Sequence, residues 1–217
     1  MPDVNPNDSV LDVLHRVKWE HDGTLALRRS CAHGVCGSDA MRINGANALA
    51  CKTLVARLAK EGSSEAKIQV EPILGMRVLK DLIVDMDQFF EHYKSVMPYF
   101  VNDEAPPENG RERLQSQADR AVFDDTTKCI LCAACTSSCP SFWANERYVG
   151  PAAIVQAHRF IFDSRDNAAA ERLEVVGDTF GVWRCRTNFN CTNACPREID
   201  VTQAIAEVKK VLATGEI

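Results

Sequence analysis

Seven of the ten cysteines lie in two short runs whose spacing suits iron–sulfur clusters. The first run reads Cys129-x2-Cys132-x2-Cys135-x3-Cys139-Pro140, and the second reads Cys185-x5-Cys191-x3-Cys195-Pro196. The first has the spacing of bacterial cluster-binding runs, in which the fourth cysteine binds the other cluster of a pair. The second lacks its central cysteine, because Asn188 stands there. Since a cuboidal cluster without one thiolate loses an iron corner, the two runs predict one [4Fe–4S] and one [3Fe–4S] centre, and with them electron transfer.

The crossover of the fourth cysteine also predicts which ligands share a cluster. The expected ligands are Cys129, Cys132, Cys135 and Cys195 for the [4Fe–4S] centre, and Cys139, Cys185 and Cys191 for the [3Fe–4S] centre. Pro140 and Pro196 lack a backbone N–H, so each is expected to stop a local helix and turn the preceding cysteine toward the opposite cluster. Structural zinc on four thiolates is the alternative, although zinc ribbons use two C-x2-C pairs and neither run has that form.

A third group of candidate ligands lies in the first half of the chain. It reads Cys31-x4-Cys36-x2-Asp39-x11-Cys51. Plant-type [2Fe–2S] loops space their cysteines C-x4-C-x2-C, and Asp39 stands where the third cysteine belongs. A carboxylate can bind ferric iron, so we interpret Asp39 as a ligand; alternatively, it only accepts hydrogen bonds while Ser38 or water fills the position. Gly34 and Gly37 are expected to let the backbone close tightly around the cluster, and the lone His33 is expected to face solvent.

The composition narrows the class of protein. The chain has 217 residues and a mass of 24.0 kDa, enough for one large domain or two small ones. A formal net charge of −5 and the lack of a Lys/Arg block argue against nucleic acid as a partner. The N-terminus has neither a basic start nor an apolar stretch, so no signal peptide is predicted and reduced, metal-binding thiols are expected. No apolar run approaches the ~18–20 residues that span a bilayer, so a membrane role is expected to come through partners.

The first half has a mixed helix and strand pattern. Apolar residues recur at helical spacing after Ser9, and Asp12 completes a capping box there. Short strands are expected around 25–27, 41–43, 68–70 and 82–84, followed by an amphipathic helix over 86–96.

The second half is expected to be a helical scaffold around its cysteines, because no strand pattern is visible there. Pro151 is expected to begin a helix that ends near Phe162. Asp200 is positioned to cap a last helix, and Gly215 follows its expected end. The predicted division is therefore α+β, with domains over 1–98 and 114–217 and a polar, proline-containing linker over 99–113.

With its three ligand sets placed, the chain resembles the iron–sulfur subunits of succinate dehydrogenase and fumarate reductase. The match extends from about residue 9 to the end of the chain. The residues that carry it in the first half are Arg28-Arg29-Ser30-Cys31, Gly34-Val35-Cys36-Gly37-Ser38-Asp39, Met41-Arg42-Ile43-Asn44-Gly45 and Leu49-Ala50-Cys51. Those in the second half are Cys129-Ile130-Leu131-Cys132, Ser138-Cys139-Pro140-Ser141-Phe142-Trp143, Gly150-Pro151-Ala152, Arg159-Phe160, Asp163-Ser164-Arg165-Asp166, Asn190-Cys191-Thr192 and Cys195-Pro196.

The resemblance implies a β-grasp domain of the plant-type [2Fe–2S] ferredoxin kind, followed by an all-α ferredoxin-like domain with two cuboidal clusters. It implies a flavoprotein partner that oxidises succinate on FAD, and a membrane anchor that binds quinone and often haem b. The chain itself would be an electron relay without a succinate site. It would pass electrons from the flavin through the [2Fe–2S], [4Fe–4S] and [3Fe–4S] centres to quinone. Such a subunit is expected to lie peripherally on the cytoplasmic face of the cell membrane.

The resemblance further implies a quinone site near Pro140, Ser141, Trp143 and Arg186. Here the chain departs from the family pattern: Ala144 follows Trp143, and Arg186 follows Cys185 where histidine is frequent. Trp143 could therefore merely pack at the anchor interface, and Arg186 could pair with a carboxylate or offset cluster charge.

Family members also usually begin with a strand hairpin before the first helix. Either the sequence is truncated or its sheet is smaller than usual. Three functional alternatives stay open at this point: a fumarate reductase subunit working in reverse, a stand-alone ferredoxin-type carrier or a subunit serving another flavin dehydrogenase, and a zinc-bound interaction module.

Overall fold

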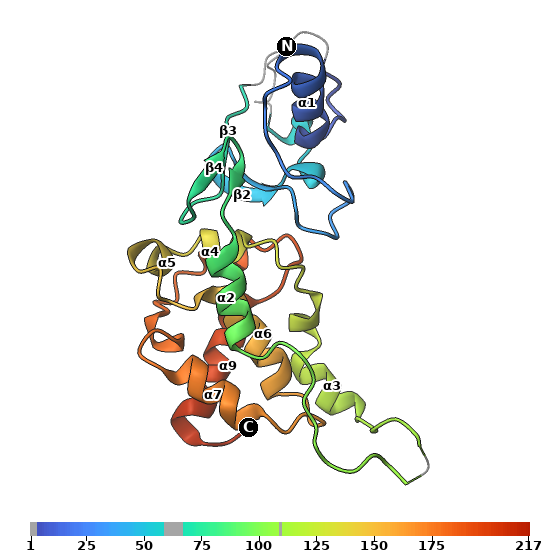
Figure 1. The fold of residues 1–217 in the computed structure, drawn as a ribbon, viewed down its shortest axis with the longest axis vertical. Coiled ribbons are helices and arrows are strands. Elements are labelled where there is room, and N and C mark those ends of the chain that lie inside the picture. The colour runs from blue at the N-terminus through green and yellow to red at the C-terminus, as the bar shows by residue number, and fades with distance from the viewer. Residues whose placement is uncertain (1–3, 59–66, 109) are drawn as a thin grey trace.

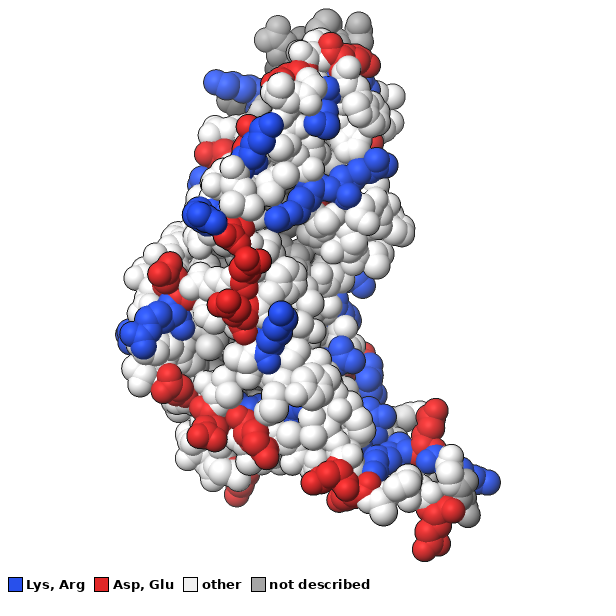
Figure 2. All heavy atoms as spheres, viewed as in Figure 1, with Lys and Arg blue, Asp and Glu red and all other residues white. Residues whose placement is uncertain are grey.

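The structure is a computed structural model that describes residues 4–58, 67–108 and 110–217. It has two parts stacked along the long axis, a mixed part that carries the N-terminus and a helical part that carries the C-terminus (Figure 1). Among the described helices, none is long and apolar enough to cross a membrane. Basic and acidic side chains are interspersed on the face seen in Figure 2.

The first part contains two small antiparallel sheets. Its regular elements are α1 (Val10–Arg16), a π-helical turn (Val17–His21), β1 (Ala40–Ile43), β2 (Ala46–Leu49), β3 (Val70–Glu71), β4 (Val78–Lys80) and β5 (Ile83–Val84), with 3₁₀ turns at Ala50–Lys52 and Val55–Arg57. Helix α2 (Asp87–Ser95) follows and lies among the helices of the second part (Figure 1). The strand order is β2-β1-β3 in one sheet and β4-β5 in the other. Helix α1 covers the larger sheet, because Val10 and Leu11 share a buried cluster with Met41 and Ile43.

The predicted capping box at the start of α1 is confirmed. The Asp12 N–H donates to Ser9 Oγ over 3.2 Å, and Asp12 Oδ2 accepts from the Ser9 N–H over 2.9 Å. Two of the backbone N–H groups that a helix start leaves without partners are thereby satisfied by residues three apart in sequence.

The strand expectations are confirmed in part. Strands lie at 40–43, 70–71 and 83–84, close to three of the expected positions. The prediction of a strand at 25–27 is wrong, since residues 25–29 have no regular structure. Strands β2 and β4 were not expected. The β1–β2 hairpin turns at Asn44 and Gly45, which have φ of 48° and 86°. Positive φ at both positions is typical of the type I′ hairpin turn, which favours Asn-Gly.

The second part is helical, as predicted, with no strand among the residues described after β5. Its helices are α3 (Gln117–Phe123), α4 (Ala134–Ser137), α5 (Pro140–Ala144), α6 (Gly150–Ile161), α7 (Ala169–Gly177), α8 (Asn190–Asn193) and α9 (Val201–Thr214), with 3₁₀ turns at Asp125–Lys128 and Val182–Arg184. Helix α6 runs through the centre, and Ile154, Ile205 and Val208 belong to one buried core that α6 forms with α7 and α9. Asp200 caps α9 by accepting from the Gln203 N–H, and Gly215 ends it at φ 74°, as expected.

The two parts share a packed junction. Helix α2 lies against α6 (Figure 1), and Phe89 joins a buried cluster with Ile73 of the first part and Ala133 and Ala152 of the second. Asn47 of β2 adds polar contacts, because its Nδ2 donates to the hydroxyls of Ser137 and Ser138 over 2.9 and 2.6 Å.

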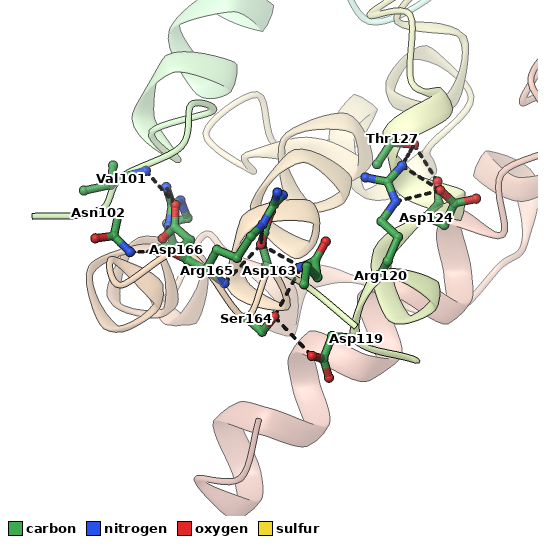
Figure 3. Close-up of polar contacts among 12 residues, drawn as sticks. Val101, Asn102, Asp119, Arg120, Asp124, Thr127, Asp163, Ser164, Arg165 and Asp166 are labelled. Atoms are coloured by element: carbon green, nitrogen blue, oxygen red, sulfur yellow. Dashed lines mark hydrogen bonds and ion pairs between the residues drawn. The ribbon is translucent and has the colours of Figure 1, made fainter. Parts of the chain in front are cut away.

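The chain that follows α2 is anchored to the turn after α6. Asp166 accepts from the Val101 N–H over 2.8 Å, and Asn102 donates to the Arg165 carbonyl over 2.6 Å (Figure 3). Arg172, a fully buried residue of α7, pairs with Asp166 over 2.6 Å and donates to the carbonyls of Met97 and Tyr99. The chain that follows α2 is therefore held by charge-assisted hydrogen bonds, which are among the stronger polar contacts in proteins.

Candidate iron–sulfur centres

The first candidate centre is a cavity that we call the four-cysteine cavity. Its lining includes Cys129, Cys132, Cys135 and Cys195, the four residues that the crossover rule groups together. Apolar side chains of Ala152, Val155 and Ile199 complete the wall. Cys129 and Cys132 come from one loop, Cys135 from the start of α4, and Cys195 from the segment after α8, so the helical core brings together residues sixty or more positions apart in sequence.

The second candidate centre is a neighbouring cavity, the three-cysteine cavity. It is lined by Cys139, Cys185 and Cys191, again the predicted set, together with Asn188, Tyr148 and Thr202. The Thr202 hydroxyl lies 3.6 Å from Cys191 Sγ, and the Thr187 N–H donates to Cys185 Sγ over 3.4 Å. The structure therefore separates the seven cysteines into the two groups that the sequence predicted.

The loops of the two cavities repeat one backbone conformation. Cys129 and Cys185 follow 3₁₀ turns with nearly equal dihedrals, φ −62° and ψ 128° against φ −67° and ψ 124°. Leu131 and Thr187 then have φ of 55° and 56°. Ala133 and Phe189 both have φ 63° and cap the short helices α4 and α8. Asn188 and Cys132 thus occupy equivalent places, each between two left-handed residues.

The third candidate centre is the loop that contains Cys31 and Cys36. The backbone N–H groups of His33, Val35 and Cys36 all point at Cys31 Sγ, over 3.5, 3.4 and 3.3 Å. These hydrogen bonds lower the pKa of the Cys31 thiol to about 5, so the thiolate that binds iron is favoured at neutral pH. Gly34 has φ 82°, in keeping with its expected role, and His33 is exposed as expected.

Asp39 lies at the same site and is only 2% exposed. Its Oδ2 accepts from the Cys51 N–H over 2.6 Å. Burial, together with the nearby Asp39 carboxylate, raises the pKa of the Cys51 thiol to about 12. Cys51 therefore keeps its proton, whereas Cys31 does not. A cation bound by both Asp39 and Cys51 would favour the Cys51 thiolate, because it would offset the repulsion between the two negative charges.

Gly37 brings the Cys31–Cys36 loop against the four-cysteine cavity. Its φ is 69°, and a Cβ built on it would lie 2.6 Å from the Cβ of Cys132 and 3.1 Å from the Ile130 carbonyl oxygen. The two ligand loops are therefore in direct contact at a residue that has no side chain.

Burial disfavours the thiolate of several cysteines in the two cavities, among them Cys129, Cys139 and Cys191, by raising their pKa. Burial raises the pKa of Cys132 to about 12 and raises that of Cys135 as well. A coordinated metal reverses this preference, because a coordinating thiol is deprotonated outright. The three-cysteine cavity also contains an orphan donor, since the buried Tyr148 hydroxyl has no hydrogen-bond partner among the described residues. Burial raises the pKa of Tyr148 far above its usual range, so the hydroxyl keeps its proton. The buried thiols fit the iron atoms of a cluster, and the unpaired hydroxyl fits an acceptor such as its sulfur atoms.

The residues expected near quinone do not line one cavity. Pro140 and Arg186 belong to the three-cysteine cavity, whereas Trp143 lines a separate hollow at the junction with Asn47 and Leu74. The Trp143 indole N–H already donates to the Ser137 carbonyl over 2.8 Å, and the residue is 47% exposed. Ser141 lies beside these residues in α5.

Comparison with known proteins decides the family. A model described as a 2Fe-2S iron-sulfur cluster binding domain matches residues 2–91, and one described as a 4Fe-4S dicluster domain matches residues 121–196. The chain is 47% identical over 203 residues to the mitochondrial succinate dehydrogenase [ubiquinone] iron-sulfur subunit 1 of Oryza sativa, covering 93% of this chain and 70% of that protein. It is 45% identical over 201 residues to the succinate dehydrogenase iron-sulfur subunit of Coxiella burnetii, covering 92% and 82%. The chain belongs to the succinate dehydrogenase iron–sulfur subunit family.

A solved structure gives the same answer for the fold. A chain of the Mycobacterium smegmatis Sdh1 complex in the apo form superposes with a TM-score of 0.82 at 26% identity, over 98% of this chain and 88% of that one. The predicted α+β architecture, with a [2Fe–2S] domain followed by a domain for cuboidal clusters, is confirmed.

Sequence reasoning missed two features of the sites. The Asn44-Gly45 dipeptide could have predicted the hairpin that presents Asn47 to the helical part, because Asn-Gly favours type I′ turns. No sequence signal marked Tyr148, whose relevance depends on a hydroxyl buried beside cysteines that are distant in sequence.

Proposed function

We propose that this chain is the electron-transfer subunit of a succinate:quinone oxidoreductase and relays electrons from a flavoprotein to membrane quinone. The observation that carries the proposal is the contiguity of the three ligand groups. The Cys31–Cys36 loop touches Cys132 through Gly37, and the four- and three-cysteine cavities are built from the same two runs. Membership of the succinate dehydrogenase iron–sulfur family supports the assignment of substrate and partners.

The proposed ligands follow the grouping of side chains described above. They are Cys31, Cys36, Asp39 and Cys51 for a [2Fe–2S] centre, Cys129, Cys132, Cys135 and Cys195 for a [4Fe–4S] centre, and Cys139, Cys185 and Cys191 for a [3Fe–4S] centre. When bound, such clusters supply one-electron redox steps at closely spaced points. The protein's contribution is to hold the thiolates, direct N–H groups at sulfur, and exclude water from the two buried cavities.

We propose two partner surfaces. Apolar residues are exposed near the three-cysteine cavity: Phe189 on its rim, and Trp183 just before Cys185. They suit the membrane anchor, with its quinone and any haem, and Arg186 and Pro140 would then lie nearest the quinone. Trp143 would contribute its exposed ring face. Exposed residues of the Cys31–Cys36 loop, such as Val35, suit the FAD-containing flavoprotein. This arrangement holds the subunit peripherally on the cytoplasmic face of the membrane.

Purification of the complex under anaerobic conditions tests the proposal. We expect the chain to co-purify with a flavoprotein and to contain about nine irons, the sum of the three proposed clusters. Low-temperature EPR should show a three-iron signal in the air-oxidised sample, and reduced [2Fe–2S] and [4Fe–4S] signals after dithionite. A chain that purifies alone, with far fewer irons or with zinc, would contradict the proposal.

The role of Asp39 has its own test. We expect Asp39→Cys to retain a [2Fe–2S] signal with altered g-values, because thiolate replaces carboxylate on one iron. Asp39→Ala should lose most of the signal, since it removes both the ligand and the acceptor of the Cys51 N–H. Ser38→Ala is the matched control and should leave the signal intact. If Ser38→Ala abolishes the signal while Asp39→Ala preserves it, the neighbouring serine is the ligand instead.

A further inference from the structure

Tyr148 lies in the turn between α5 and α6, and its backbone is fixed on both sides. Its N–H donates to the Asn145 carbonyl over 3.0 Å, and the next residue, Val149, donates to the Phe180 carbonyl over 3.1 Å. The ring is fully buried, with 0% of its surface exposed, and packs in the core cluster that also contains Phe142, Ile154 and Val182. The orientation of the side chain is therefore set by the core.

The hydroxyl of this tyrosine has no partner within the described part of the chain. A buried hydroxyl without a hydrogen bond is costly, and tyrosines buried in cores normally place theirs beside an acceptor. Such an orphan donor points to an acceptor that the polypeptide itself does not supply.

The surroundings indicate what that acceptor is. Tyr148 lines the three-cysteine cavity with Cys139, Cys185 and Cys191. The Thr202 hydroxyl, which lines the same cavity, already has hydrogen-bond partners: it lies 2.8 Å from the Thr192 hydroxyl and 3.6 Å from Cys191 Sγ. Thiolate and inorganic sulfide are the acceptors that a cluster would bring to this cavity.

We infer that the Tyr148 hydroxyl donates a hydrogen bond to a sulfur atom of the three-iron centre and raises that centre's reduction potential. The inference rests on the proposed function, which places that centre between the three cysteines. Reduction adds negative charge to the cluster, and part of this charge resides on sulfur. A donor aimed at sulfur therefore stabilises the reduced state more than the oxidised state, and burial in a low-dielectric core strengthens the effect. Tyr148 is a positioning and tuning residue, since it neither replaces a ligand nor carries the electron.

Redox titration of the intact complex, followed by EPR, tests the inference. Tyr148→Phe removes only the hydroxyl and keeps the ring in the core. We expect the variant to assemble the three-iron centre and to show a midpoint potential shifted to lower values, with the other two centres unchanged. Tyr99→Phe is the control, because Tyr99 is exposed and its side chain lies outside the cavity; its potentials should match those of the parent protein.

A second readout is independent of potential. The clusters of the complex are reconstituted in D₂O, and deuterium ENDOR is recorded on the oxidised three-iron signal. A deuterium coupling should be detected in the parent complex and in Tyr99→Phe, and it should disappear in Tyr148→Phe. An unchanged potential together with an unchanged deuterium spectrum would overturn the inference while leaving the relay function intact. A parent complex without any three-iron signal would instead overturn the ligand assignment in the proposed function, and the Tyr148 inference with it.

Discussion

Gly37 shows how much one missing side chain decides in this molecule. It lies at φ 69°, in the left-handed region, and the position of its absent Cβ is 2.6 Å from the Cβ of Cys132. Real Cβ atoms do not approach one another so closely, so any other residue would push the Cys31–Cys36 loop away from the four-cysteine cavity. The contact matters for function because electron tunnelling falls steeply with the distance between centres.

We therefore expect Gly37→Ala to lower the free energy of unfolding by about 1–2 kcal/mol, because alanine disfavours the left-handed conformation. Displacement of the loop should lower it further. The magnetic interaction between the reduced [2Fe–2S] and [4Fe–4S] centres should weaken in EPR. Gly215→Ala is the matched control, since Gly215 has φ 74° but no atom within 4 Å of its added Cβ. Equal losses of thermal stability and an unchanged interaction in both variants would show that the contact at Gly37 is unimportant.

At the scale of elements, the two cavities are variations on one loop. Each consists of a 3₁₀ turn, a cysteine, two left-handed residues that flank a central position, and a four-residue helix. The central position is Cys132 in one loop and Asn188 in the other. Because the backbones agree within a few degrees at the flanking residues, the loss of a ligand at Asn188 reflects its side chain and not a rearranged loop.

Asn188→Cys is therefore expected to supply a fourth thiolate and convert the three-iron centre into a [4Fe–4S] centre. The three-iron EPR signal of the oxidised protein should disappear, and about one more iron should be bound per chain. Asn190→Cys is the control, because Asn190 lines the same cavity but begins helix α8, outside the ligand spacing. Persistence of the three-iron signal in Asn188→Cys would mean that this side chain points away from the cluster.

At the scale of the whole molecule, Arg172 joins the chain that follows α2 to the turn after α6. Its guanidinium bonds Asp166 and two carbonyls of the chain that follows α2, and both charged side chains are fully buried. Removing one partner of a buried ion pair leaves an uncompensated charge, which typically costs about 3–5 kcal/mol.

We expect Arg172→Met to lower the free energy of unfolding by about that amount and to expose residues near 97–103 to proteolysis. Arg120→Met should change stability by about 0–1 kcal/mol, because the Arg120–Asp124 pair is exposed. Chemical denaturation and limited proteolysis provide the measurements. A similar small loss in both variants would show that the buried pair does not hold the chain that follows α2.

Removal of iron should affect the helical part most. Helices α4 and α8 have four residues each, far below the ~12–15 residues at which isolated helices become even marginally stable. Ligated metal contributes directly to the stability of the folded state. An iron chelator that bleaches the clusters should therefore reduce the helical circular dichroism, whereas EDTA under conditions that leave the clusters coloured should not. Unchanged helical signal after bleaching would count against this dependence.

Features that depend on local spacing could be predicted from the residues alone. Ligand runs, the capping box at Ser9 and the ends of α9 are encoded within a few residues, because capping and chelation require particular side chains at fixed offsets. The division of the seven cysteines into two groups was also predicted, since the crossover is a property of the run itself.

Which distant residues meet depends on the packing of the whole chain. The strand expected at 25–27 did not form, and β2 formed from Ala46–Leu49, a segment of low strand propensity, because pairing with β1 across the Asn44-Gly45 turn satisfies its backbone. The contact of Gly37 with Cys132 and the unpaired hydroxyl of Tyr148 likewise depend on packing between segments far apart in the chain. The residue pattern of a short sequence segment cannot specify such contacts, because they result from the burial of surfaces that meet only when the whole chain folds.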